Sequence, residues 1–296
     1  MRRSGRGRLR TAITAGAGIL LIAAFAGYGP RMLTLAESRH PVGRSASPAG
    51  PTPPPDWSRE GTFLTASRSY PAVVRLLASG GSPYCSGSVV HSTGGDLVMT
   101  AAHCVYASGS YLTGTTVVPG LSGGSRPYGS WQVDHVWIDP RYTAEGHDED
   151  YDYAFLRVGR SDGRAIESAA GADTLTVDQP FHLLGVTTTG YPESGDPGNR
   201  QLTCTLPTYQ SPAHRAYREM HCGGYTAGVS GAPWVLLSPG SRTGRLVGLI
   251  GGFNGGGPPD GTPHEDAISY SPYFDAATEA LLRQAESGNG GHDSGS

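Results

Sequence analysis

At residues 97–104 the chain reads Leu97-Val98-Met99-Thr100-Ala101-Ala102-His103-Cys104. The apolar start of this segment predicts a short buried strand. The strand runs straight into a histidine, and a disulfide at the neighbouring cysteine would hold that histidine in one orientation. A general base needs such a fixed aim. A lone histidine more often lies in an ordinary loop, so a catalytic role for His103 requires partners elsewhere in the chain.

Short apolar runs between turn residues recur on both sides of this strand. Several short strands with turns between them predict a sandwich or barrel, and the missing strand–helix alternation argues against a doubly wound parallel sheet. One helix is predicted over 272–285, where Ser271 can cap it and Pro272 suits its first position. The predicted strands are 72–78, 87–91, 97–100, 111–118, 131–138, 153–158, 181–187, 201–206, 234–237, 245–250 and 268–270.

Composition limits the class of protein. The 296 residues include 45 Gly and 23 Pro, which favours a turn-rich globular fold and excludes a coiled coil or a helical bundle. The formal net charge is −3, so the chain as a whole lacks a basic footprint for nucleic acid.

The first 26 residues have the pattern of an export signal. An arginine-rich start precedes an apolar run over 12–26, and Ala24-Phe25-Ala26 fits a cleavage site. The alternative is an uncleaved membrane anchor, and both interpretations place the rest of the chain outside the cytoplasm. Residues 27–60 follow as a Pro-rich linker or pro-segment, and 61–285 are the folded part. The Gly/Ser-rich end over 286–296 is expected to be disordered.

Four cysteines, an even number in an exported chain, indicate disulfides. Three pairings are possible. The local one, Cys85–Cys104 with Cys204–Cys222, would put one bridge in each half of the folded part. A zinc site is the alternative, but no two cysteines have the C-x2-4-C spacing that zinc sites use.

A second block places a carboxylate directly before an apolar strand, in Asp150-Tyr151-Asp152-Tyr153-Ala154-Phe155-Leu156. Such a carboxylate can be drawn into the edge of the core, where it can accept an imidazole N–H and stabilise the imidazolium. The alternatives are a solvated acidic loop and a calcium site in that loop, although no ligand spacing there matches a known calcium loop.

A third block surrounds a serine with glycines, in Gly228-Val229-Ser230-Gly231-Ala232-Pro233. Glycines permit a tight turn with backbone N–H groups on one side, which exposes the hydroxyl and forms an oxyanion pocket. Taken by itself, the block also fits a simple Gly/Ser turn.

Together the three blocks, T-A-A-H-C, D-Y-A-F-L and G-V-S-G-A-P, resemble the chymotrypsin/trypsin-like serine protease family, and within it the bacterial exported branch. The resemblance implies two antiparallel six-stranded Greek-key β-barrels, over 61–172 and 173–271, with the active site in the cleft between them and a C-terminal helix. The chain order His, Asp, Ser also argues against an α/β-hydrolase, which runs Ser, acid, His.

The resemblance also implies a role for each residue of the site. His103 would be the general base, Asp152 its orienting carboxylate and Ser230 the nucleophile. The backbone N–H groups of Gly228 and Ser230 would form the oxyanion hole. Cys85–Cys104 would be the family's bridge behind the histidine.

Two departures from the family are informative. The usual third block reads G-D-S-G-G-P, whereas this chain has Val229 in place of the acid and Ala232 in place of the second glycine. In the animal digestive members that acid pairs with a new N-terminal amine after activation cleavage. Val229 offers no charge, so maturation by that switch is not expected.

Residues near Ser230 limit which residue is expected before the cleaved bond. The segment 222–229 contains no carboxylate, which disfavours a basic residue before the cut. Ile250 stands nearest the place where Glu-specific relatives usually carry a histidine, which disfavours glutamate. An apolar or small residue is therefore expected. The cleft is expected to include Gly224, Tyr225, Gly251 and Gly252, where bare glycine backbone can pair with an extended peptide.

The sequence thus predicts a secreted serine endopeptidase that hydrolyses polypeptides through an acyl-enzyme. It is expected to be a monomer that needs no metal or organic cofactor and binds no nucleic acid. If the signal is not cut, residues 1–26 would serve as an N-terminal membrane anchor. The alternatives are a catalytically silent binding module on the protease fold and an exported structural β-protein.

Overall fold

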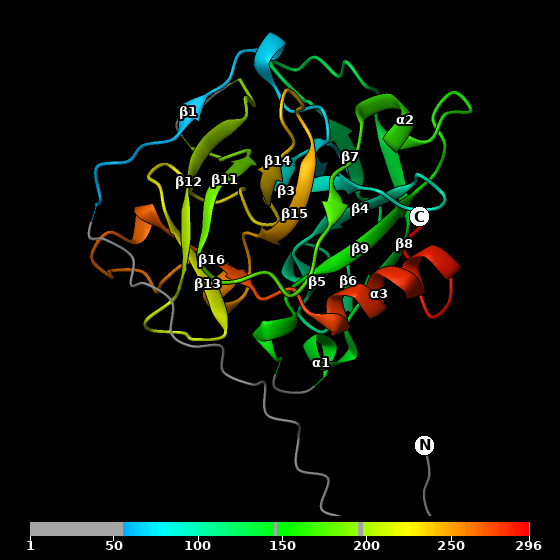
Figure 1. Ribbon diagram of the computed structural model, residues 1–296. Coiled ribbons are helices and arrows are strands. Elements are labelled where there is room, and N and C mark those ends of the chain that lie inside the picture. The colour runs from blue at the N-terminus through cyan, green and yellow to red at the C-terminus, as the bar shows by residue number, and fades with distance from the viewer. Residues whose placement is uncertain (1–55, 145–146, 195–197, 296) are drawn as a thin grey trace, which may run out of the picture. The chain divides into compact units, whose positions relative to one another are not determined.

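The computed structural model describes residues 56–144, 147–194 and 198–295 (Figure 1). The predicted signal peptide and residues 27–55 of the predicted linker lie outside this part of the chain. Among the described residues, no helix is long and apolar enough to cross a membrane.

The first sheet closes on itself. Its strands pair antiparallel in the order β8-β7-β2-β3-β4-β9, and β8 also pairs with β9, so six strands form a barrel. Buried apolar side chains fill it, among them Trp131, Trp137 and Phe155. The strands are β2 (Val73–Leu77), β3 (Pro83–Val90), β4 (Leu97–Thr100), β7 (Thr116–Pro119), β8 (Trp131–Ile138) and β9 (Ala154–Val158).

The second sheet follows the path β10-β15-β14-β11-β12-β13-β16 and has a smaller core around Trp234. Within the described ranges no pairing joins its two ends, so its closure into a second barrel stays a prediction. The strands are β10 (Thr174–Leu175), β11 (Leu183–Gly190), β12 (Leu202–Gln210), β13 (Tyr217–His221), β14 (Pro233–Leu237), β15 (Gly244–Leu249) and β16 (Ile268–Pro272).

The all-β class is confirmed, and the few remaining elements are short. The hairpin β5–β6 follows the histidine segment, and α1 and α2 are single turns that the sequence analysis did not predict. These elements are β5 (Tyr106–Ala107), β6 (Ser110–Tyr111), α1 (Pro140–Thr143), α2 (Ile166–Ala170) and the 3-10 turns η1 (Ala66–Arg68), η2 (Ala102–Cys104), η3 (Glu149–Tyr151), η4 (Phe253–Gly255) and η5 (Glu265–Ala267).

The C-terminal helix exists, but its predicted start at residue 272 is wrong. Pro272 ends β16, where it pairs with Tyr217. Helix α3 (Ala276–Ser287) begins after Asp275, whose carboxylate accepts the N–H of Ala277 while the Thr278 hydroxyl accepts the N–H of Asp275. This reciprocal cap decides the start. The helix packs against β8 and β9 (Figure 1).

Two segments pair differently from the predicted domain plan. Residues 286–296 were expected to be disordered, yet β17 (His292–Asp293) pairs with β8, and the Trp137 indole donates to the carbonyl of Asn289. At the other end, β1 (Thr62–Phe63) pairs with β12 of the second sheet rather than joining the first barrel. Both ends of the described chain thus pair with a strand of one of the two sheets.

Candidate active site

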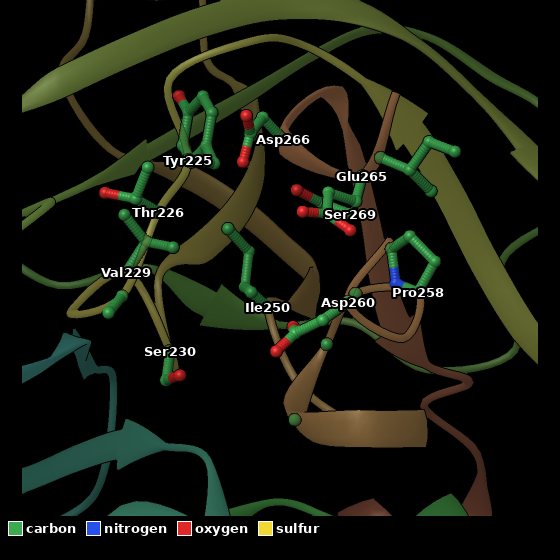
Figure 2. Close-up of a pocket in the computed structure, with 15 residues that line it drawn as sticks. Tyr225, Thr226, Val229, Ser230, Ile250, Pro258, Asp260, Glu265, Asp266 and Ser269 are labelled. Carbon is green, nitrogen blue, oxygen red and sulfur yellow. The ribbon is translucent and has the colours of Figure 1, made fainter. Parts of the chain in front are cut away.

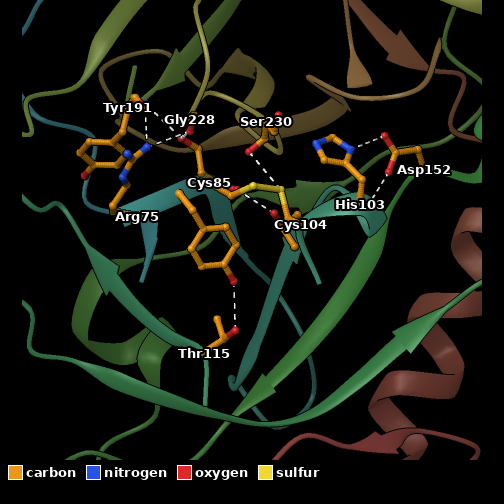
Figure 3. Close-up of a disulfide and its surroundings, with 12 residues drawn as sticks. Arg75, Cys85, His103, Cys104, Thr115, Asp152, Tyr191, Gly228 and Ser230 are labelled. Carbon is orange, nitrogen blue, oxygen red and sulfur yellow. Dashed lines mark hydrogen bonds and ion pairs between the residues drawn. A yellow bond between two sulfur atoms is a disulfide. The ribbon is translucent and has the colours of Figure 1, made fainter. Parts of the chain in front are cut away.

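His103 lies in the 3-10 turn η2, immediately after the buried strand β4. Its neighbour Cys104 forms a disulfide with Cys85 on β3, which fixes the turn against the barrel. The backbone N–H of His103 donates to Oδ1 of Asp152 at 2.9 Å, and its ring nitrogen Nδ1 lies 2.8 Å from Oδ2 (Figure 3). The side chain of His103 is 29% exposed, so the other ring nitrogen can reach a substrate.

Asp152 is completely buried at the start of β9, which pairs with β4 and so brings the carboxylate to the histidine. It accepts a third hydrogen bond, from the backbone N–H of Gly252 at 2.8 Å. Burial alone would raise the pKa of Asp152, but His103 and these N–H groups lower it on balance. The carboxylate therefore stays ionised and directs the Nδ1 proton, which leaves Nε2 as the basic nitrogen.

Asp152 in turn changes the pKa of the His103 imidazole. Burial would lower the pKa of His103, but the negative charge of Asp152 and its hydrogen bond raise it on balance. A raised pKa makes the ring a stronger base, as a proton acceptor from a hydroxyl requires.

Ser230 lies in a turn between two glycines with positive φ, Gly228 at 91° and Gly231 at 80°. A Cβ on Gly231 would lie 2.3 Å from the backbone oxygen of Ser86, so only glycine fits there. The turn is joined to the first barrel, because the N–H of Ser86 donates to the carbonyl of Ser230 at 2.8 Å.

The disulfide brings this turn close to the histidine. The Cys104 sulfur lies 3.7 Å from the carbonyl oxygen of Ser230 and within 4.8 Å of a ring nitrogen of His103. In Figure 3 the imidazole is seen between Ser230 and Asp152. The turn that carries Ser230 and the turn that carries His103 thus both lie beside the Cys85–Cys104 disulfide, although they come from distant parts of the chain.

The loop that carries Ser230 is held by an arginine that the sequence analysis missed. Arg75, only 1% exposed, donates to the carbonyl of Gly228 at 2.9 Å and also to the carbonyl of Tyr191 (Figure 3). The Ser86 hydroxyl donates to the same Gly228 carbonyl at 2.9 Å. Within the described residues, the N–H groups of Gly228 and Ser230 have no recorded acceptor, which leaves them free for an oxyanion. The only sequence feature that points to this role of Arg75 is that it stands as a lone arginine inside an apolar strand.

Both disulfides of the local pairing are present, Cys85–Cys104 and Cys204–Cys222. The sulfurs beside His103 are bonded to each other and offer no thiolate to zinc. In the acidic loop considered for calcium, the carboxylate of Asp148 accepts the N–H of Asp150, and Glu149 accepts the N–H of Asn254. These two carboxylates cap local backbone groups.

A pocket adjoins Ser230 (Figure 2), and the predicted cleft residues take different places around it. Tyr225 lines the pocket and donates its hydroxyl to the carbonyl of Thr188. Gly224, Gly251 and Gly252 do not line it. Gly251 and Gly252 lie against Asp152 instead, since a Cβ on Gly251 would stand 3.0 Å from its Oδ2. The glycines that border the pocket are Gly255, Gly256 and Gly257.

Comparison with known proteins agrees with this geometry. A family model described as Trypsin matches residues 60–269. The chain belongs to the trypsin family. The matched range includes all three blocks that suggested the family from the sequence.

Among curated proteins, a glutamyl endopeptidase of Bacillus licheniformis is 32% identical over 192 residues, which is 63% of this chain and 55% of that protein. An extracellular metalloprotease of Bacillus subtilis is 31% identical over 140 residues, 45% of this chain and 43% of that one. The chain spans about half the length of these curated relatives.

Solved structures share the fold. The protease Anisep from Arthrobacter nicotinovorans superposes with a TM-score of 0.62 at 23% identity, covering 74% of this chain and 97% of that one. A Glu endopeptidase superposes with a TM-score of 0.60 at 20% identity, covering 77% and 97%.

Proposed function

We propose that this chain is an exported serine endopeptidase in which Ser230 is the nucleophile, His103 the general base and Asp152 its orienting carboxylate. The observation that carries the proposal is the buried carboxylate of Asp152, which holds both the backbone N–H and the ring nitrogen of His103 at 2.9 Å and 2.8 Å. A carboxylate fixed in this way sets the tautomer that a serine hydroxyl needs as its base.

The reaction then follows from the positions of these groups. The Ser230 hydroxyl oxygen attacks the carbonyl carbon of the peptide while its proton passes to Nε2 of His103. The resulting oxyanion accepts hydrogen bonds from the N–H groups of Gly228 and Ser230. His103 next gives its proton to the leaving amine, and an ester to Ser230 remains. Water, deprotonated by the same imidazole, releases the acid and restores the hydroxyl.

Export is part of the proposal. The arginine-rich start and apolar run over 1–26 support it, as do the two disulfides, which persist in oxidising compartments. One relative is named an extracellular metalloprotease. Identifying the N-terminal residue of the exported protein tests whether the signal is cut or anchors the chain.

A fluorophosphonate probe, which reacts with activated serines, tests the proposal. We expect the purified protein to be labelled and to hydrolyse casein. Ser230→Ala abolishes labelling, His103→Ala reduces turnover on the order of a millionfold, and Asp152→Asn somewhat less. The matched control is Ser82→Ala, which removes an exposed hydroxyl in the turn before β3.

Labelling that survives both Ser230→Ala and His103→Ala would end the proposal. Protein that is inert towards both the probe and casein would favour a silent binding module or a structural role.

The cleavage preference is a separate matter. The expectation of an apolar or small residue before the cut depends on the segment 222–229 and on Ile250 alone, and the relative named a glutamyl endopeptidase raises glutamate as an alternative.

A further inference from the structure

Two stretches of chain form the walls of the pocket beside Ser230 (Figure 2). One wall is the segment 225–230, which ends at the nucleophile, and the opposite wall comes from 255–269. The pocket has a volume of about 200 Å³. A space of this size beside the nucleophile contacts a bound peptide near the cleaved bond, so the way the two walls are held affects how tightly the peptide binds.

The two parts of the second wall are held differently. Its end, 268–269, belongs to β16 and is fixed by pairing with β13. Residues 259–266, here called the pocket loop, also contribute to the lining. Among the described residues, every recorded hydrogen bond of the pocket loop stays within the loop or joins it to the adjacent Ala267. These bonds shape the loop, but its place relative to the first wall depends on other contacts.

Trp57 supplies such a contact. Its ring stacks on the imidazole of His264 in the pocket loop, with the ring centroids 4.4 Å apart and the planes 4° apart. It also stacks on His221, with the centroids 4.5 Å apart and the planes at 27°. His221 ends β13, from which the chain runs on through Cys222 to the first wall. One indole therefore links the pocket loop to the strand that leads into the opposite wall.

His221 is the fixed partner in this arrangement. Its Nε2 lies 2.6 Å from Oε1 of Glu219, and its side chain is only 10% exposed. The next residue, Cys222, is bonded to Cys204. His264 is exposed at the surface. Because one imidazole is anchored and the other is exposed, the stack restrains the pocket loop rather than β13.

The indole of Trp57 is placed by the backbone that follows it. The N–H of Gly223 donates to the carbonyl of Arg59 at 2.7 Å, and the N–H of Gly61 donates to the carbonyl of Gly223 at 3.0 Å. A Cβ on Gly223 would lie 2.5 Å from a carboxylate oxygen of Glu60, so the two segments approach closely there. The indole is thus in position before a substrate arrives, which lowers the cost of ordering the loop on binding.

We propose that Trp57 is a positioning residue of this protease, which holds the pocket loop in its peptide-binding arrangement by stacking on His221 and His264. The inference rests on the proposed function of Ser230. Trp57 does not line the pocket, so it acts on the substrate through the loop. When only a fraction of molecules has the loop in place, the apparent affinity for the peptide falls by that fraction.

Steady-state hydrolysis of one peptide amide that the unaltered protein cleaves tests this role. We expect Trp57→Ala to raise KM roughly tenfold, the size of two lost ring stacks, and to change kcat less than about twofold. Trp57→Phe retains an aromatic ring and should recover most of the loss. His264→Ala removes an exposed side chain and should raise KM by a similar factor. It should add little to Trp57→Ala in the double variant, because both changes break the same stack.

The matched control is Phe63→Ala. Phe63 is also a half-buried aromatic residue of the first described segment, but its recorded ring contact is with Arg200, which does not line the pocket. The change should leave KM and kcat as they are in the unaltered protein.

Tryptophan fluorescence gives a readout besides activity. The chain has four tryptophans, and the other three are at most 2% exposed: Trp131, Trp137 and Trp234. Added acrylamide therefore reaches Trp57 first. His264→Ala uncovers one face of that indole and should increase the quenching, whereas Phe63→Ala should not.

Fluorophosphonate labelling of Ser230 separates this inference from the function on which it rests. Normal labelling with an unchanged KM in Trp57→Ala and His264→Ala would refute the positioning role and leave the serine protease standing. An equal rise of KM in Phe63→Ala would refute it as well, since the effect would then come from the stability of the segment. Absence of both labelling and cleavage in the unaltered protein would overturn the proposed function and the positioning role with it.

Discussion

Replacing Arg75 by methionine tests how the loop that carries Ser230 is held. In digestive relatives an acid in the nucleophile block is paired with a charge, but here that position is Val229, which is 4% exposed and packs among apolar residues. The Gly228 carbonyl instead accepts hydrogen bonds from the Arg75 guanidinium and the Ser86 hydroxyl, both at 2.9 Å. Burial lowers the pKa of Arg75 to about 10, so it remains a cation at neutral pH. Methionine keeps much of the apolar stem and removes the charge.

The size of the effect follows from the contacts that are lost. One charge-assisted hydrogen bond is worth about 1.5–3 kcal/mol, and the Ser86 bond to Gly228 remains in the variant. If that energy keeps the two N–H groups aimed at the oxyanion, its loss lowers kcat about 10- to 100-fold. KM should change little, because the oxyanion forms only after binding. Arg75→Lys, which retains a cation, should recover part of the loss.

The assay is steady-state hydrolysis of a peptide amide, with the labelling rate of the fluorophosphonate probe and thermal unfolding measured on the same samples. The matched control is Arg218→Met, because Arg218 is also 1% exposed and donates to backbone carbonyls, but of Val247 and Pro180 rather than of the serine loop. Both variants are expected to lose stability, and only Arg75→Met to lose kcat in the folded protein. Equal losses of kcat in the two variants, or none in Arg75→Met, would refute the reasoning.

Other predictions concern charge and capping. Because the pKa of His103 is raised and the neutral ring is the working form, kcat/KM should rise with pH through a midpoint above about 6.5; full activity at pH 4 would exclude it as the base. Asp152→Asn should lower kcat about 10⁴-fold without unfolding the protein, as circular dichroism would check. Burial raises the pKa of Asp173 to about 6, so the folded form holds its proton more tightly than the unfolded chain. The free energy of unfolding should therefore fall by up to about 3 kcal/mol from about pH 4 to about pH 6, and Asp173→Asn should abolish that fall in urea titrations; coincident profiles would contradict this. Asp275→Ala removes the cap of α3 and should cost about 1 kcal/mol in the same titration.

Much of the site could be predicted because its signals are local. Strand β4 has the predicted bounds, since an almost wholly apolar run leaves few alternatives for burial, and β8 has them as well, since its apolar residues recur on one face of the strand. Asp152 is buried as expected for a carboxylate that leads into such a strand. The disulfide pairing, left open by counting alone, is the one that the resemblance implied for Cys85–Cys104.

Features that depend on distant pairing could not be predicted from local signals. Pro272 is a residue type that favours the start of a helix, but within β16 its backbone pairs with Tyr217. The helix therefore begins only after its cap residue, Asp275. The end of the chain is Gly/Ser-rich, yet β17 pairs with Val136 and His135 of β8. Asp260, Glu265 and Asp266 line the pocket beside Ser230 because of how the segment after β15 returns to the serine, which no periodicity encodes.

Strand β3 ties the two halves of the site together through two consecutive residues. Cys85 is bonded to Cys104 beside the histidine. Ser86 contacts the serine loop twice, because its N–H donates to Ser230 and its hydroxyl donates to Gly228, and that hydroxyl also accepts the N–H of Tyr191, which follows β11. A shift of this strand would move the base and the nucleophile together, which keeps their separation constant. Because these bonds and that of Arg75 hold the loop through backbone groups that exist before any cleavage, we expect the loop to need no newly made terminal amine, as the uncharged Val229 also predicts.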